Sequence, residues 1–208
     1  MRKEFGAATV LVLLLGQGLR ADFTVDFTVA DRGLALSNVG SPYAELTVKT
    51  NANGTVTFTV TNLGEASKLG TLGFNLNGLT PSDLRVVSGP SNWGLQGGGQ
   101  MSGFGMYDEE FGPNNNSNSL RQTSYSFVLA STSGKALTAS DFLADNSGNA
   151  GIAPRAFDFA LEVFPSDGNT GYAGAPAVPA PPSVALFASA AFCGGLVWWR
   201  RRKGPLTV

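Results

Sequence analysis

The chain has 208 residues, a formal net charge of −1, no histidine and one cysteine, Cys193. Ser-His-Asp and Cys-His catalysis and His-ligated zinc sites are therefore excluded, because each needs an imidazole. The length fits one ordinary domain between two terminal segments of different composition.

The N-terminus has the composition of a secretory signal peptide. Arg2–Lys3 precedes an apolar run from Ala7 to Leu15, and small residues follow that run. A basic region, an apolar region and a small-residue region in this order are typical of a segment that the Sec translocon exports and signal peptidase removes. We predict a signal peptide over residues 1–21, cut after Ala21, with Gly18 as the alternative site.

Residues 22–176 alternate apolar and polar side chains at the period of a β-strand. The clearest segments are 23–29, 55–61 and 157–163, and further strands are expected at 44–49, 71–76, 84–88 and 124–130. Period two over such lengths indicates strands with one buried face. Turns are favoured by Asn-Gly at 53–54 and 77–78 and by Asp-Gly at 167–168. The predicted fold is all-β, an antiparallel β-sandwich that resembles cohesin-like or jelly-roll domains.

Two short segments share the pattern Leu-Thr-x-Ser-Asp followed by a large apolar residue, at 79–84 and 137–142. Ser, Thr and Asp bond nearby backbone N–H groups, so each copy is expected to make a turn or one helical turn that holds its apolar residue in the core. A duplicated binding site is the alternative. The Gly-rich segment 97–105 and the Asn-rich segment 114–119 are expected to be long loops.

The predicted domain is acidic. Residues 22–181 contain 7 Lys and Arg and 14 Asp and Glu, which gives 7 − 14 = −7. A surface of this sign does not attract phosphate backbones, so nucleic acid is not an expected partner, whereas solubility outside the cell is favoured. Cys193 lies beyond the domain, so no disulfide is expected within it.

Asp108, Glu109 and Glu110 form the most conspicuous group of acids, beside the Gly-rich segment. Carboxylates together with backbone carbonyls can hold calcium, and a carboxylate pair can hydrolyse a glycosidic bond. Adjacent acids in a strand, however, point to opposite faces of a sheet. We therefore assign the three residues as a possible ligand or calcium loop, and we assign no catalytic residue, no resident metal and no cofactor.

Two further features bear on ligands. Trp93 and Tyr107 are the aromatic residues in polar loops that could form a sugar-binding platform, although Trp93 is equally suited to fill the core. Threonine occupies every second position from 55 to 61, which favours an exposed strand face. An array that orders water or ice is a minor alternative for this threonine row.

The C-terminal segment has three parts. Val178, Pro179, Ala180 and Pro181 come first, an uncharged run from Val184 to Trp199 follows, and Arg200, Arg201, Arg202 and Lys203 end the segment. The run spans about 24 Å as a helix, so its neighbours must help to cross the roughly 30 Å core of a bilayer. We predict a transmembrane helix over 182–199 and a cytoplasmic stop at 200–203, because Lys and Arg mark the cytoplasmic side of such helices.

This order of signal peptide, exported domain, proline motif, short apolar helix and basic cluster resembles a PEP-CTERM protein, a substrate of exosortase in Gram-negative bacteria. The resemblance covers about residues 178–203, and Ala180 stands where the family motif Val-Pro-Glu-Pro has its glutamate. It implies that residues 177–203 anchor the precursor transiently in the inner membrane. It also implies that the exosortase removes this tail and that the protein then reaches the cell surface or the extracellular matrix.

The expected function is structural or adhesive, in contact with extracellular polysaccharide, as the resemblance implies. A secreted carbohydrate-binding or carbohydrate-active domain is the alternative from another class, and a calcium- or ice-binding domain is a minor one. We do not expect the chain to be an enzyme.

Overall fold

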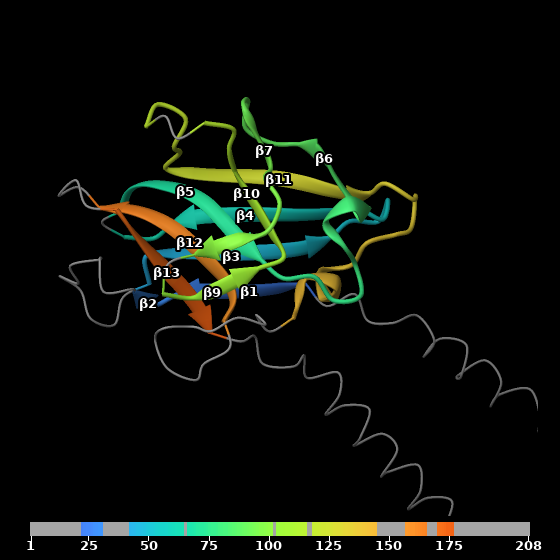
Figure 1. The fold of residues 1–208 in the computed structure, drawn as a ribbon, viewed down its shortest axis with the longest axis horizontal. Helices are drawn as coiled ribbons and strands as arrows, with labels where there is room; N and C mark the ends of the chain where they lie inside the picture. Colours follow the sequence, from blue (N-terminus) through green and yellow to red (C-terminus); the bar gives the residue numbers. More distant parts are fainter. Residues whose placement is uncertain are drawn as a thin grey trace, which may run out of the picture. The chain divides into compact units, whose positions relative to one another are not determined.

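Two antiparallel sheets contain most strands of the computed structural model (Figure 1). The structure describes residues 22–30, 42–64, 66–101, 103–115, 118–144, 157–165 and 170–176. The predicted signal peptide, the sorting motif at 178–181, the predicted transmembrane helix at 182–199 and the basic stop at 200–203 lie outside these residues. Within the described ranges, no helix has the length and apolar character needed to cross a membrane.

Sheet A has five strands in the order β1, β3, β4, β11, β6. Their bounds are Phe23–Phe27 for β1, Ala44–Thr50 for β3, Val56–Asn62 for β4, Ser124–Ser131 for β11 and Leu84–Ser88 for β6. All four pairings in this sheet are antiparallel.

Sheet B has six strands in the order β2, β13, β12, β5, β10, β7. Their bounds are Val29–Ala30 for β2, Gly171–Pro176 for β13, Phe157–Pro165 for β12, Ala66–Phe74 for β5, Glu109–Pro113 for β10 and Trp93–Leu95 for β7. The pairings are again antiparallel. The predicted all-β, antiparallel fold is therefore confirmed. The predicted strand at 23–29 is divided, because the chain leaves sheet A after Phe27 and enters sheet B at Val29.

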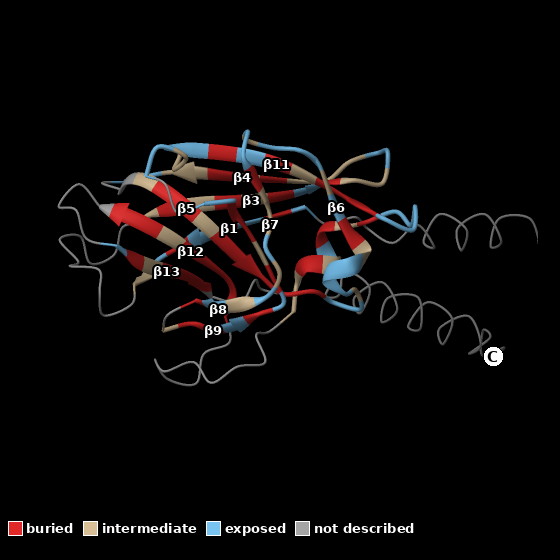
Figure 2. Ribbon diagram, turned by 45° about the horizontal axis from the view of Figure 1, so that its top comes forward, coloured by how far each residue is buried: buried red, intermediate tan, exposed pale blue. Residues whose placement is uncertain are grey.

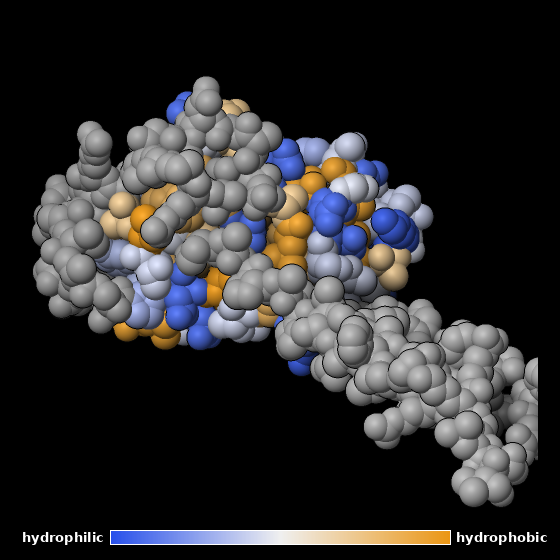
Figure 3. Space-filling model, turned by 90° about the horizontal axis from the view of Figure 1, so that it is seen from below, coloured by the Kyte–Doolittle hydropathy of each residue, from blue (hydrophilic) through white to orange (hydrophobic). Residues whose placement is uncertain are grey.

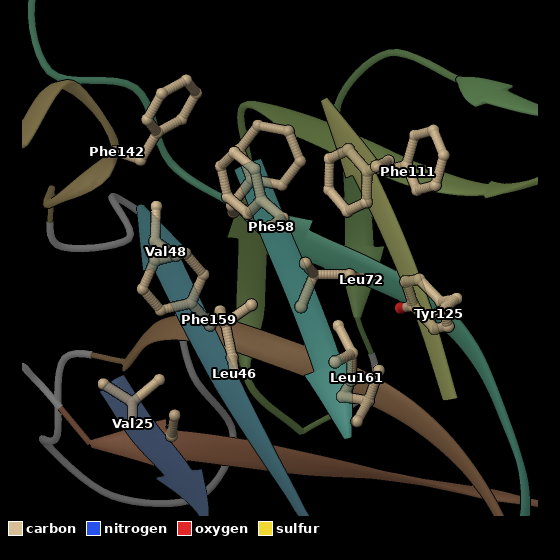
Figure 4. Packing of buried hydrophobic residues seen from close by; sticks show 14 of the residues in the cluster. Val25, Leu46, Val48, Phe58, Leu72, Phe111, Tyr125, Phe142, Phe159 and Leu161 are labelled. Carbon is tan, nitrogen blue, oxygen red and sulfur yellow. The ribbon is translucent and has the colours of Figure 1, made fainter. Parts of the chain in front are cut away.

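Alternate residues of both sheets build the core between them (Figure 4). The ring of Phe58 in sheet A stacks on Phe127 with 4.7 Å between centroids, and it contacts Phe74 of sheet B at 5.5 Å. Large apolar side chains of this kind each stabilise the fold by about 1.5–3 kcal/mol when buried. The buried Tyr125 hydroxyl donates to the Gly70 carbonyl of sheet B at 2.9 Å, so this polar group is also satisfied.

The two Leu-Thr-x-Ser-Asp segments form matching 3-10 helices, η1 (Pro81–Asp83) and η2 (Ala139–Phe142). In each copy the Asp carboxylate accepts the backbone N–H of the preceding Thr, at 2.8 Å for Asp83 and 2.7 Å for Asp141. Phe142 is fully buried, and its ring meets Phe58 edge-on at 4.9 Å. Leu84, which follows η1, is also buried in the core, so the expected helical turn that places an apolar residue in the core is confirmed for both copies.

The Gly-rich segment forms a short ribbon rather than the long loop that we expected. Strands β8 (Gly99–Met101) and β9 (Gly105–Tyr107) pair with each other and lie over the outer face of sheet B (Figure 2). Met101, Phe104 and Tyr107 of the ribbon are buried against the outer side of β12. The prediction of a loop was wrong because these three apolar side chains anchor the segment to the sheet.

Small residues of sheet B make room for the ribbon. Gly174, Ala160 and Gly73 are register neighbours on β13, β12 and β5. A Cβ at Gly174 would overlap the ring of Phe104, and a Cβ at Gly73 would lie 3.0 Å from Met101. Glycine at these two positions therefore allows the close approach of the ribbon to the sheet.

Candidate functional site

Asp108 lies in the link between β9 and β10, where it joins the ribbon to the end of β5. Its carboxylate accepts the N–H of Leu76 at 2.9 Å, and its own N–H donates to the side-chain carbonyl of Asn75 at 3.2 Å. The Asp108 side chain thus bonds to the backbone after β5, and the Asn75 side chain bonds to the backbone of Asp108. This arrangement holds the ribbon in place, and it uses one carboxylate oxygen that a ligand would need.

Glu109 is buried, with 2% of its surface exposed. One carboxylate oxygen accepts three backbone N–H groups, from Gln96 at 3.1 Å, Gly97 at 2.6 Å and Glu110 at 3.1 Å. Burial raises the pKa of Glu109, and the three donors oppose this shift because they favour the charged form. Glu109 therefore organises the turn that leads from β7 into the ribbon.

Glu110 lies on the outer face of sheet B, below Gly99 of the ribbon, where a Cβ on that glycine would collide with the carboxylate. Burial, together with the charges of Glu109 and Glu162, raises the pKa of Glu110. Burial also raises the pKa of Glu162 in β12, although the Arg121 guanidinium, 3.8 Å from its carboxylate, opposes this shift. The Glu162 carboxylate also accepts the N–H of Thr71 at 3.4 Å.

The three predicted acids thus point to different surroundings. Asp108 bonds to the end of β5, Glu109 bonds to the turn after β7, and Glu110 packs beneath the ribbon. Among the residues that the structure describes, no group of three acidic or other metal-ligating side chains could hold a metal ion. The contacts of these acids account for them as structural groups, so we do not carry the calcium loop into the proposal below.

The two aromatic residues considered for a sugar platform are both buried. Trp93 has 7% of its surface exposed, and its indole N–H donates to the Leu120 carbonyl at 2.9 Å. Its ring lies 4.7 Å from that of Tyr125 in the core. Tyr107 is 2% exposed and faces sheet B from the ribbon. Neither ring is presented to solvent for stacking on a sugar.

The outer face of sheet A carries rows of hydroxyl groups that cross several strands. Register places four residues side by side on β1, β3, β4 and β11, namely Thr24, Thr47, Thr59 and Ser126. The Thr24 and Thr47 oxygens are 3.2 Å apart, as are the Thr59 and Ser126 oxygens. Strands in a sheet are about 4.8 Å apart, so the row is a regularly spaced series of polar groups. We call this row and its hydroxyl neighbours Thr57, Thr61 and Ser124 the hydroxyl face.

Charges on this side of sheet A are few and lie beyond the central row. Asp26 and Glu45 are register partners at one end, and Lys49 and the exposed Arg85 lie toward the other end. Asp22, which is exposed and precedes Thr24 by two residues, adds a third acid beside Lys49. Three acids and two bases sum to 2 − 3 = −1, a small part of the negative charge of the domain. The hydroxyl face therefore offers neutral hydrogen-bonding groups.

Large exposed apolar side chains do not form a rival surface in the described part of the chain. Leu63, Val87 and Met106 are about half exposed, and they belong to three separate segments. Figure 3 shows apolar residues interspersed with polar ones on the face that it presents. Isolated exposed apolar residues are ordinary on soluble surfaces and do not define a contact site.

Sequence reasoning identified only part of the hydroxyl face. The alternating threonines of β4 were visible, but Thr24, Thr47 and Ser126 come from strands far apart in the sequence. Their alignment depends on the register of three strand pairings, and alternation within single strands does not determine register between strands. A search for alternating Ser and Thr in every predicted strand would have found the separate pieces.

Comparison of the chain with protein-family models, with curated proteins and with solved structures finds no match.

Proposed function

We propose that the chain is an exported, non-catalytic protein that an exosortase sorts through a membrane-spanning C-terminal tail. Its cohesin-like or jelly-roll sandwich then serves a structural or adhesive role in the extracellular matrix, where the hydroxyl face contacts neutral polysaccharide. The terminal segments support export and sorting through their composition and order. The row of Thr24, Thr47, Thr59 and Ser126 is the observation that carries the proposed contact.

Hydroxyl groups suit a polysaccharide because each can donate one hydrogen bond and accept others, as sugar hydroxyls do. The Thr24–Thr47 contact needs one proton, so one hydroxyl of that pair can still donate. In the Thr59–Ser126 pair both protons are used, because Ser126 donates to the Phe58 carbonyl at 2.8 Å, and this pair offers acceptors only. The low charge around the row favours a neutral polymer, and the acidic domain repels polyanions. The carbohydrate-active alternative has less support, because both carboxylates are engaged within the fold. Glu110 packs beneath Gly99, and Glu162 contacts the Arg121 guanidinium and the Thr71 N–H.

Binding of the mature protein to cellulose and to a soluble neutral glucan tests the proposed contact, with alginate as the anionic counterpart. We expect binding to a neutral glucan and none to alginate. The double variant T47V/T59V keeps the shape and strand propensity of both residues but removes their hydroxyls. With about 0.5–1.5 kcal/mol for each hydrogen bond, its affinity should fall roughly tenfold or more.

Ser91→Ala is the matched control, because Ser91 is exposed in the turn before β7 and lies outside the hydroxyl face. It should bind like the wild-type protein, and all variants should have the same melting temperature. Wild-type binding to alginate alone, or T47V/T59V binding at full strength, would show that the hydroxyl face is not the contact surface.

A further inference from the structure

The first strand begins immediately after the predicted signal-peptide cleavage site. Asp22 follows the bond at Ala21, and its carboxylate accepts the N–H of Thr50 at 2.7 Å. Phe23 is the next residue, and it is already paired with Val48 of β3. The residues that follow the predicted bond are therefore held in sheet A when the domain is folded.

Strands β1 and β2 together close one side of the sandwich. β1 is the edge strand of sheet A, β2 is the edge strand of sheet B, and only Thr28 separates them. Phe23, Val25 and Phe27 all point into the core. The ring of Phe23 reaches Phe159 of sheet B at 5.8 Å between centroids. Undocking β1 would therefore expose core residues from both sheets.

We propose that pairing of β1 with β3 and cleavage of the Ala21–Asp22 bond exclude each other, so the signal peptide is removed before β1 closes the sandwich. This inference rests on the proposed export. Proteases commonly bind substrates as extended strands, with main-chain bonds on both sides of the cleaved bond. A protease cleft encloses the strand that it cleaves from both edges, whereas docked β1 has one edge paired with β3 and the side chain of Phe23 in the core. Residues 22–24 therefore cannot enter such a cleft while β1 is docked. Cleavage itself is hydrolysis: the C–N bond breaks, Ala21 gains a carboxylate and Asp22 gains an amine.

An engineered disulfide that joins β1 to β3 tests this order of events in the full-length precursor. Thr24 and Thr47 project from paired positions, with their oxygens 3.2 Å apart, so the variant T24C/T47C should form a disulfide that fixes β1 on β3. Cys193→Ser is introduced in every variant to prevent other disulfides. The folded precursor is incubated in detergent with purified signal peptidase, and the products are identified by mass spectrometry.

Oxidised T24C/T47C precursor should be cleaved at least tenfold more slowly than the reduced form, and adding reductant should restore the faster rate. The matched control is T59C/S126C, which has the same 3.2 Å separation of oxygens but locks β4 to β11. This control should be cut at one rate in both redox states. Val48→Ala, which weakens the packing of β1 without altering residues near the bond, should speed cleavage severalfold.

A peptide of residues 10–30 separates this inference from the proposed export. If the peptide is cut and the oxidised T24C/T47C precursor is cut as fast as the reduced one, the proposed exclusion is overturned while export stands. If signal peptidase cuts neither the peptide nor any precursor, the export assignment fails and this inference fails with it.

Discussion

Glu109 shows how a single acidic residue that resembles a ligand can serve the fold instead. Its carboxylate oxygen accepts three backbone N–H groups in a buried turn. Glu109→Ala would leave these donors without their acceptor, so the free energy of unfolding should fall by about 1–3 kcal/mol. Urea denaturation of the mature protein measures this change. Asp26→Ala, at an exposed position in β1, is the control and should have little effect.

Glu110 should make stability depend on pH. Its pKa is raised above 4.5 in the folded protein by burial and by Glu109 and Glu162. The folded state therefore holds the proton more tightly than the unfolded state, and stability falls as pH rises from about 4.5 through the raised pKa. Glu110→Gln removes this loss, so the variant should be more stable than the wild-type protein at pH 7.

Urea denaturation at pH 7 and at pH 4 distinguishes this effect from a change in packing. The advantage of Glu110→Gln should shrink at pH 4, because both states of the wild-type protein then bind the proton. An equal difference at the two pH values would contradict the electrostatic explanation.

At the scale of elements, the β8–β9 ribbon depends on glycine in the sheet below it. A Cβ at Gly174 has no room beside the rings of Phe104 and Phe157. Gly174→Ala should therefore displace the ribbon, lower stability by about 1–3 kcal/mol and speed amide hydrogen exchange over residues 99–107. Gly64→Ala is the control, since its nearest contact would be 3.4 Å away. Unchanged exchange in Gly174→Ala would show that the ribbon is not seated on these glycines.

Alternation predicted most of the sandwich, because β3, β4 and the first half of β11 bury every second side chain. β12 also alternates in sequence, but it is buried on both faces because the ribbon covers its outer side. It could not predict the ribbon. Met101, Phe104 and Tyr107 stand three residues apart among glycines, and their partners Phe157 and Ala160 lie on a distant strand. The same limit applies to the hydroxyl face and to Trp93, whose burial depends on contacts with Phe111 and Tyr125 rather than on its polar neighbours.

At the scale of the whole molecule, the domain should fold without either terminal segment. Its described strands begin at Phe23 and end at Pro176, and the only cysteine of the chain lies beyond them. Residues 22–176 expressed alone should therefore be soluble, with a β-rich circular dichroism spectrum that reductant does not change. A helical or unfolded spectrum would rule out an independent domain at these bounds.

The proline motif of the tail should act separately from membrane insertion. Proline fixes an extended backbone, which is the form that a protease binds. Changing Pro179 and Pro181 to Ala should leave the precursor inserted but slow its maturation, as measured by pulse-chase immunoblotting in cells that carry an exosortase. Maturation at the wild-type rate would mean that the motif is only a linker. Changing residues 200–203 to Ser should instead weaken retention in the membrane, because the basic stop would be lost.

Mass spectrometry of the extracellular protein from exosortase-carrying cells tests the central claim, export with removal of both terminal segments. The account predicts a chain that begins at Asp22 and lacks Arg200, Arg201, Arg202 and Lys203. An extracellular chain that keeps Met1, or one that keeps the basic cluster, would contradict it.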